Sequence, residues 1–454
     1  MRKISISLVL LSSLACASVT TVNTIKDVFS KAEVSGNIKY YYIDTDKDST
    51  NLGKSYTSSH ANSIGGQLHY QTASLYGFDV KATFMTTNAF LLPNVVDTSI
   101  IGRDNAVALG KSPGDIVAQE SFSVLGEILL SYKYSGLTAW MGRNVIKTPL
   151  INAKEVRMLP SAVQGYHFDY AFKNGAVIGA SYLDFFKQRT AYKFTNIIEH
   201  ALGVNTQAIT GSTQGSVVVA NMGLNLDTIN MNFTNYYASN FMNSFYAEID
   251  YRNSILKESK FGLALQGLSQ SSIGNADNNL EQASSITGGK RISTSMVGVK
   301  AHLSYHESKL YAAYTYVDSD KNSHDSLILP WDGTPLFTNM ITSNNLFQSN
   351  YGKALNADSA YIGGTHGSKL AFQQGYNFTG VNGFKSLLAV SNYTNHSFLE
   401  NQRDLNAVVS YSYDTFSIAL KGIFVQNNTT ASANGTITQT DHLTQYRVIA
   451  NYKF

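Results

Sequence analysis

The sequence contains little cysteine and little proline. Cys16 is the only cysteine, and it lies in the N-terminal segment discussed below. A mature chain without Cys16 has neither a disulfide framework nor a thiolate metal site. Apolar burial or hydrogen-bonded closure of the backbone must therefore stabilise the fold. The six prolines are informative by position, because proline cannot donate to the hydrogen-bond ladder of a sheet.

An excess of charge of one sign is also lacking. The chain has 34 Lys and Arg against 31 Asp and Glu. Arg2 and Lys3 belong to a predicted signal peptide, so the mature chain is almost neutral and gives no indication of a nucleic-acid partner. After residue 17, no apolar run is long enough for a transmembrane helix. In contrast, the 28 Tyr and 23 Phe suit long strands with aromatic girdles.

The N-terminal segment has the features of a secretory signal peptide. Three residues with two cationic side chains precede the apolar run 4–14, which is too short to span a bilayer. Small residues flank Cys16 in a small-x-small cleavage pattern, so we expect residues 1–17 to be removed. A lipoprotein anchored through Cys16 is disfavoured, because Ser13 stands where an aliphatic residue would be needed.

Apolar and polar residues alternate with period two along most of the mature chain, which is typical of β-strands. Each run has about the ~9–11 residues that a tilted strand needs to cross a bilayer. The eighteen predicted strands are 34–44, 60–73, 77–87, 122–134, 137–147, 163–172, 176–186, 216–226, 229–239, 244–252, 260–271, 293–306, 309–319, 367–378, 384–395, 403–414, 417–427 and 444–454.

The connections between these strands alternate between short and long, except for a very short one after the ninth strand. All six prolines fall in the long connections. A soluble sandwich does not require this alternation, whereas an outer-membrane barrel has short periplasmic turns and long outer loops. The long connections are 88–121, 148–162, 187–215, 272–292, 320–366 and 428–443.

These patterns predict an all-β fold, a transmembrane antiparallel β-barrel of about 18 strands over residues 34–454. A sheet in hydrocarbon must close on itself, because each unpaired backbone group costs several kcal/mol. An even strand number places both chain ends in the periplasm, with 18–33 as a periplasmic N-terminal segment. The last strand then pairs with the first, and Phe454 lies in the periplasmic aromatic girdle. The alternative is a soluble edge strand that ends in Phe454.

If the apolar stripe of each strand faces lipid, the opposite face lines a water-filled lumen. Lys or Arg on the lipid face at mid-membrane would cost ~2–4 kcal/mol, so charges confined to one face indicate the lumen. Basic residues outnumber acidic ones on that face. The predicted pore-lining residues are Lys39, Lys81, Glu127, Lys133, Asp169, Glu248, Arg252, Lys300, Lys421 and Arg447.

A barrel of this size leaves an aqueous channel unless something narrows it, and one segment is a candidate. In order, it carries Gly142, Arg143, Thr148, Pro149, Asn152, Glu155, Arg157, Pro160, Gln164 and Gly165. This series resembles the third-loop region of OprD-type porins, in particular the Opr-family porins of epsilon-class proteobacteria. Glu155 departs from that pattern, because the family often has Asp there.

The resemblance, which is weaker over the rest of the mature chain, implies a third loop that folds into the barrel. It also implies passive uptake of small, often anionic, solutes. We therefore expect an inward constriction loop at about 148–162, with weak anion preference or a bound carboxylate near it. The predicted constriction residues are Arg143, Lys147, Asn152, Lys154, Glu155 and Arg157.

The sequence thus predicts an outer-membrane porin of a Gram-negative bacterium that is not an enzyme and needs no cofactor or metal. The alternative is an adhesin or receptor barrel that uses the long loops 88–121, 187–215 and 320–366. An outer-membrane hydrolase would need a Ser or His constellation, and no motif marks one. The predicted partners are outer-membrane lipid and lipopolysaccharide, small-molecule solutes, and the barrel-assembly machinery, which a terminal aromatic such as Phe454 would engage. Monomer and homotrimer both stay open.

Overall fold

A computed structural model describes most of the chain. The described residues are 20–49, 57–90, 121–153, 157–202, 214–256, 258–276, 291–320, 322–341, 362–395, 400–430 and 437–454. The predicted signal peptide, residues 1–17, lies outside them. The same holds for Lys154 and Glu155 of the predicted constriction.

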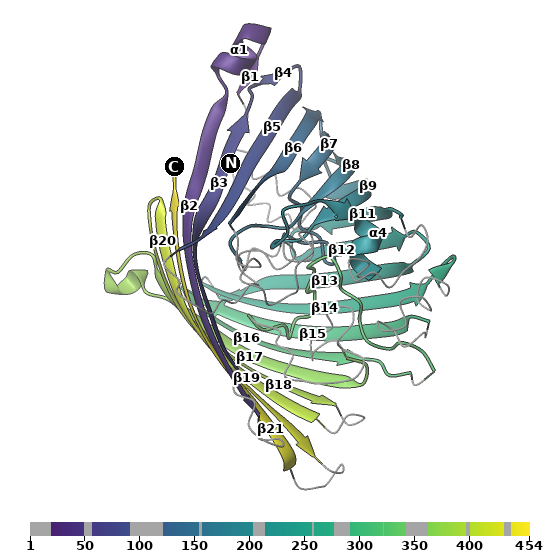
Figure 1. The fold of residues 1–454 in the computed structure, drawn as a ribbon, viewed down its shortest axis with the longest axis vertical. Coiled ribbons are helices and arrows are strands. Elements are labelled where there is room, and N and C mark those ends of the chain that lie inside the picture. The colour runs from purple at the N-terminus through teal and green to yellow at the C-terminus, as the bar shows by residue number, and fades with distance from the viewer. Residues whose placement is uncertain are drawn as a thin grey trace.

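Eighteen long strands form one closed antiparallel barrel, which confirms the predicted fold class and strand number (Figure 1). Neighbours in sequence pair all the way round, and the last strand pairs with the first. The strands are β2 (Glu33–Ser49), β3 (Thr57–Gln71), β5 (Phe78–Ala89), β6 (Phe122–Tyr134), β7 (Leu137–Asn144), β8 (Ala162–Ala171), β9 (Ala176–Lys187), β11 (Val217–Asn225), β12 (Ile229–Ala238), β13 (Met242–Leu256), β14 (Ser259–Ser272), β15 (Ser293–Tyr305), β16 (Ser308–Val317), β17 (Thr365–Gly375), β18 (Phe384–Asn395), β19 (Glu400–Tyr413), β20 (Phe416–Thr430) and β21 (Ile437–Lys453).

Short elements accompany the barrel wall. No helix among the described residues is both long and apolar enough to cross a membrane. The short elements are β1 (Thr21–Val22), β4 (Ser74–Leu75), β10 (Thr195–Asn196), α1 (Ile25–Ser30), α4 (Ile197–Leu202) and the 3₁₀ helix η4 (Asn377–Thr379).

The N-terminal segment lies over the turn between β3 and β5. Strand β1 runs parallel to β4, and the Ser74 backbone N–H donates to the Thr20 carbonyl over 2.8 Å. The side chain of Thr24 caps α1 by accepting from the backbone N–H of Asp27 at 3.2 Å. Figure 1 shows α1 and the C-terminus toward one end of the barrel. We call this the terminal end, and the opposite end the loop end.

The barrel closes where β2 meets β21. Gly36 and Phe454 exchange two backbone hydrogen bonds of 2.9 and 3.0 Å. A Cβ atom on Gly36 would lie 2.8 Å from the Phe454 ring, so glycine makes room for the terminal side chain. Tyr446, Tyr452 and Phe454 are exposed on the outer face, as expected of a closing strand.

Several strands extend further than predicted at the loop end. Strands β20 and β21 leave only residues 431–436 between them, so most of the predicted loop 428–443 is paired strand. Likewise β2 continues to Ser49. The sequence pattern marked only the part of each strand with an apolar stripe. Beyond that stripe both faces carry polar side chains, and the alternation fades while the hydrogen-bond ladder continues.

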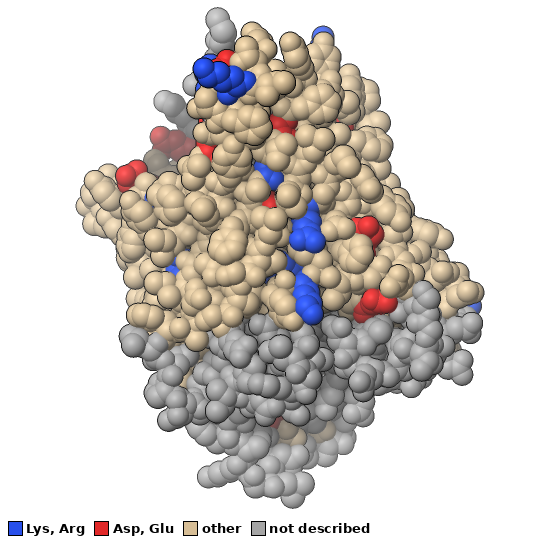
Figure 2. Space-filling model, turned by 45° about the horizontal axis from the view of Figure 1, so that its top comes forward, with Lys and Arg blue, Asp and Glu red and all other residues tan. Residues whose placement is uncertain are grey.

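The outer and inner faces differ as the alternation requires. Large apolar side chains such as Val297, Leu388 and Leu420 are exposed outward, each with about half or more of its surface accessible. Figure 2, in which the terminal end is turned forward, shows a surface with few and scattered charged residues. Aromatic pairs gather near the terminal ends of strands, for example Phe78 on Tyr132 with ring centroids 4.5 Å apart. Such a surface suits a bilayer.

Candidate pore constriction

Residues 145–161 connect β7 to β8, and the structure describes 145–153 and 157–161 of this connection; we call it the constriction loop. The Thr148 Oγ1 donates to the Ile151 carbonyl and accepts from the Ile151 N–H, both at 2.9 Å. Pro149 occupies the tip, where its fixed φ suits a turn and its missing N–H is not needed. The Ala153 N–H donates to the Ile146 carbonyl at 3.1 Å. The Thr-Pro pair noted in the sequence therefore builds the tip of a small hairpin.

The tip of this hairpin docks on the inner face of the barrel wall at β12. Tyr236 of β12 is fully buried, and its hydroxyl donates to the Thr148 Oγ1 at 2.8 Å. The same hydroxyl accepts from the Leu150 backbone N–H at 3.2 Å. Strand β12 is the third wall strand after β8, so the loop extends beyond the strands that it connects.

The returning limb of the loop contacts the opposite side of the wall. The Lys39 Nζ of β2 donates to the Arg157 carbonyl at 2.5 Å. Strands β2 and β12 are the first and ninth of the eighteen wall strands, so they face each other across the barrel. The described parts of the constriction loop, 145–153 and 157–161, therefore contact two distant parts of the wall.

A second inward segment, residues 322–341, was not predicted; we call it the inner segment. Gln270 of β14 exchanges two hydrogen bonds with the backbone of Ile328, at 2.7 and 2.8 Å. Gln266, four residues earlier on the same inward face, accepts from the Phe337 N–H at 2.7 Å and donates to the Pro335 carbonyl at 2.9 Å. Each side-chain amide thus donates to and accepts from the backbone of the inner segment, as a neighbouring strand would do in a sheet.

The inner segment also contacts the other side of the lumen. The Tyr393 hydroxyl of β18 donates to the Thr338 carbonyl at 2.6 Å, and the Ile341 N–H donates to the Asn406 Oδ1 of β19 at 2.8 Å. This corrects the expectation that 320–366 is a surface loop, at least for residues 322–341. The overlooked signal was the apolar run "SLILPWDGTPLF", residues 326–337, which would be costly to expose.

The constriction loop and the inner segment interlock. The Gly333 N–H donates to the Leu150 carbonyl and the Asn152 N–H to the Trp331 carbonyl, both at 3.0 Å. A Cβ atom on Gly333 would lie 2.3 Å from Leu150, so only glycine fits. The carboxylate of Asp332 accepts from the Ser161 hydroxyl at 2.5 Å and pairs with Arg189. These contacts make the two segments one unit.

The ten predicted pore-lining residues all occupy inward positions, because their neighbours along each strand are exposed outward. Many of them already have partners. Glu127 is 2% exposed, pairs with Lys81 at 2.9 Å and accepts from the Val145 N–H at 3.2 Å. Arg447 donates to Gln445 at 2.7 Å. These charges therefore hold the wall and the start of the constriction loop. An ion pair also joins Arg252 to Asp250, and His167 is hydrogen-bonded to Asp169 at 2.6 Å.

Lys300 and Lys369 are placed differently. They lie on one inward row of the sheet, on either side of Ala313. The Lys300 Nζ lies 4.1 Å from the centre of the Phe337 ring, and the Lys369 Nζ donates to the Asn339 carbonyl. Both line a cavity of about 1090 Å³ between the barrel wall and the inner segment. Sequence reasoning included Lys300 but missed Lys369.

The predicted constriction residues do not all lie in the same place in the structure. Lys147 and Asn152 form a bridge in the hairpin, and Arg157 lies on the limb that receives Lys39. Lys154 and Glu155 lie outside the described residues. Among the described residues, no group of three or more His, Cys, Asp or Glu side chains is arranged to hold a metal ion.

Arg143 does not belong to this group, which corrects the prediction that it faces the lumen. It is in register with Ile128, which is 45% exposed on the outer face. Its guanidinium donates to the Gln164 Oε1 at 3.1 Å and lies 4.3 Å from the Phe194 ring centre. The cause is Trp140, which is 4% exposed and stacks on His167 inside the barrel. An inward Trp140 fixes Arg143 on the outer face.

Comparisons with known proteins agree with this geometry. No protein family and no curated protein matches the sequence. Among solved structures, the chain resembles OccK8 (OprE) of Pseudomonas aeruginosa, with a TM-score of 0.68 and 14% identity over 94% of this chain and 99% of that one. It resembles OccAB3 of Acinetobacter baumannii, with a TM-score of 0.69 and 12% identity over 94% and 100%. It also resembles OpdK of Pseudomonas aeruginosa with vanillate, with a TM-score of 0.65 and 12% identity over 93% and 98%. The chain therefore has the fold of these proteins over nearly its whole length.

Proposed function

We propose that this chain is an outer-membrane porin through which small hydrophilic solutes diffuse passively. The observation that carries this proposal is the constriction loop, which joins β12 to β2 across the lumen through Tyr236 and Lys39. A solute that crosses the barrel must pass the constriction loop and the inner segment. The outward apolar side chains and the likeness to OccK8 and OpdK support an outer-membrane location.

The solutes include small carboxylates. Lys300 and Lys369 border the 1090 Å³ cavity under the inner segment. Low-dielectric walls focus the field of a few fixed charges in a narrow water column, and ammonium groups attract carboxylates there. OpdK, whose structure contains vanillate, provides a carboxylate example on this fold. Arg157 contributes from the constriction loop.

The test of the function is conductance in a planar bilayer. The purified barrel should produce discrete channel openings with a conductance that rises with salt. A sealed bilayer at all voltages would overturn the porin proposal and favour an adhesin or receptor barrel.

The test of the solute class is the reversal potential in a salt gradient. We predict that Lys300→Glu, Lys369→Glu and Arg157→Glu each shift the preference toward cations, because each replaces a positive charge near the water path by a negative one. Arg143→Glu is the matched control, since it makes the same charge change on the outer face and should leave the potential unchanged. An equal shift in Arg143→Glu, or none in the other three, would contradict this placement.

A further inference from the structure

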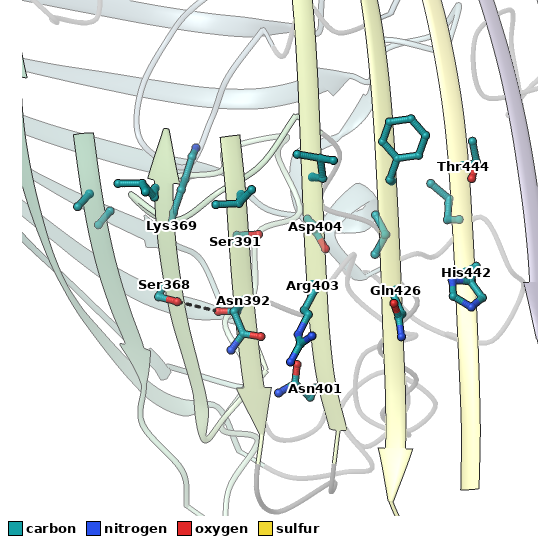
Figure 3. A pocket seen from close by; sticks show the side chains of 18 residues that line it. Ser368, Lys369, Ser391, Asn392, Asn401, Arg403, Asp404, Gln426, His442 and Thr444 are labelled. Atoms are coloured by element: carbon teal, nitrogen blue, oxygen red, sulfur yellow. Dashed lines mark hydrogen bonds between the residues drawn. The ribbon is translucent and has the colours of Figure 1, made fainter. Parts of the chain in front are cut away.

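On the outer face of β16 to β21, the side chains change from apolar to polar between two successive outward positions of each strand. The sheet register defines two adjacent rows of outward side chains. The apolar row consists of Ala312, Leu370, Val390, Leu405 and Phe424. The polar row, nearer the loop end, consists of Ser368, Asn392, Arg403, Gln426 and His442. Figure 3 shows the labelled members of the polar row side by side across neighbouring strands.

A cavity of about 960 Å³ lies along both rows. Most of its lining residues occupy outward positions, so it is a depression of the outer wall and separate from the pore. Its floor is formed by large apolar side chains, among them Leu370, Leu405 and Phe424. The cavity therefore combines an apolar floor with a polar margin at the loop end.

Two members of the polar row have unused hydrogen-bonding capacity. Neither Arg403 nor His442 makes a side-chain hydrogen bond or an ion pair with any of the described residues, and both are exposed. Gln426 stands between them, so two strand spacings of ~4.8 Å each separate them. Asp48 of β2, in register with His442, bounds the row with a negative charge. An anion would therefore be bound at Arg403.

The surroundings decide which anion fits. In the proposed location, this wall faces lipid and its loop end faces outward. The outer leaflet of a Gram-negative outer membrane is built from lipopolysaccharide, a phosphorylated glycolipid with acyl chains. Arginine pairs bidentately with phosphate, and amide side chains suit sugar hydroxyl groups. In this lipid the phosphorylated sugar headgroup lies outside the acyl chains. The headgroup would therefore meet the polar row, which is nearer the loop end, and the acyl chains would meet the apolar row.

We propose that the two rows form a binding site for a phosphorylated glycolipid of the outer leaflet. Arg403 holds the phosphate, and Asn392, Gln426 and His442 contact the sugar. The acyl chains lie over the floor formed by Leu370, Leu405 and Phe424. This site rests on the proposed outer-membrane location and does not depend on what passes through the pore.

The experiment measures lipopolysaccharide binding to the purified full-length barrel in detergent by native mass spectrometry. Wild type should bind intact lipopolysaccharide more tightly than the same lipid with its phosphates removed. Arg403→Gln should weaken binding of the intact lipid roughly ten-fold or more, as expected for a lost charge-assisted contact. Arg403→Lys, which keeps the charge without the bidentate geometry, should lose less. Arg143→Gln is the matched control on the same outer face, and its binding should equal wild type.

Other outcomes would overturn the site. Equal binding by Arg403→Gln and wild type, or no dependence on the lipid phosphates, would remove Arg403 from lipid recognition. An oligomer that dissociates in Arg403→Gln while lipid binding is unchanged would identify the row as a contact between copies. Conductance is measured on the same samples. Channels without phosphate-dependent binding would overturn this site alone, and binding without channels would overturn the porin proposal alone.

Discussion

Lys187 shows how one side chain positions the constriction. The residue ends β9 and is fully buried. Its Nζ donates to the carbonyls of Pro160, Gln188 and Ala191 at 3.1, 3.2 and 3.4 Å. An ammonium group has three donors, and all three are satisfied, which offsets the cost of burying the charge. The end of the constriction loop is thereby attached to β9.

The facing of single residues can be tested at β15. Val299→Arg should reduce insertion of the barrel, because Val299 is an outward residue in the middle of the strand and a charge there costs ~2–4 kcal/mol. Lys300→Glu, next to it on the inner face, should insert normally. The measurement is the yield of heat-modifiable barrel in membranes. Poorer insertion of Lys300→Glu than of Val299→Arg would show that the facing of β15 is inverted.

At the scale of single residues, the alternation of apolar and polar residues predicted which side chains point inward, provided that the strand carries an uninterrupted apolar stripe. All ten predicted pore-lining residues follow it. Arg143 is the exception, since Trp140 packs inside the barrel against His167 and thereby reverses the pattern locally. Partners such as Glu127 with Lys81 depend on strand register, which period two does not specify.

At the scale of elements, the interlock between the constriction loop and the inner segment should resist opening. Asp332→Asn removes the charge that pairs with Arg189 and weakens the acceptor of Ser161. Breaking such a buried pair costs on the order of 3–5 kcal/mol. We therefore predict noisier channels with larger conductance and faster chymotrypsin cleavage within 322–341, which contains Trp331 and Phe337. Asp414→Asn, at an exposed turn, is the control and should behave as wild type. Unchanged current noise and cleavage in Asp332→Asn would contradict a stabilising role for this pair.

The sequence predicted all eighteen wall strands, but not the inner segment. Strands were recognisable because each repeats the same alternation over a known length. The constriction loop was found through its resemblance to a known loop. The inner segment has neither a period nor a known pattern, and its position depends on distant side chains such as Gln266, Gln270 and Tyr393. Only its apolar composition indicated that it is buried.

For the whole molecule, the terminal residue should matter more for assembly than for stability. Deleting Phe454 removes one pair of hydrogen bonds with Gly36 from a large closed ladder. We predict a lower yield of heat-modifiable barrel in the outer membrane of cells and nearly unchanged thermal stability of the barrel that does form. Phe454→Tyr keeps the aromatic ring and should assemble as wild type. Normal assembly of the deletion variant would argue against recognition of the terminal aromatic.

The pairing of β2 with β21 also sets an order of events during synthesis. Asn37 is in register with Lys453, so the two strands that close the barrel are made first and last. The wall therefore cannot be completed before β21 has been made. Until then the earliest strand has a free edge, which is open to pairing with other chains. Because the contact is so distant in sequence, closure is slow. The hazard of edge-to-edge aggregation is therefore confined to the interval between the synthesis of β2 and its pairing with β21.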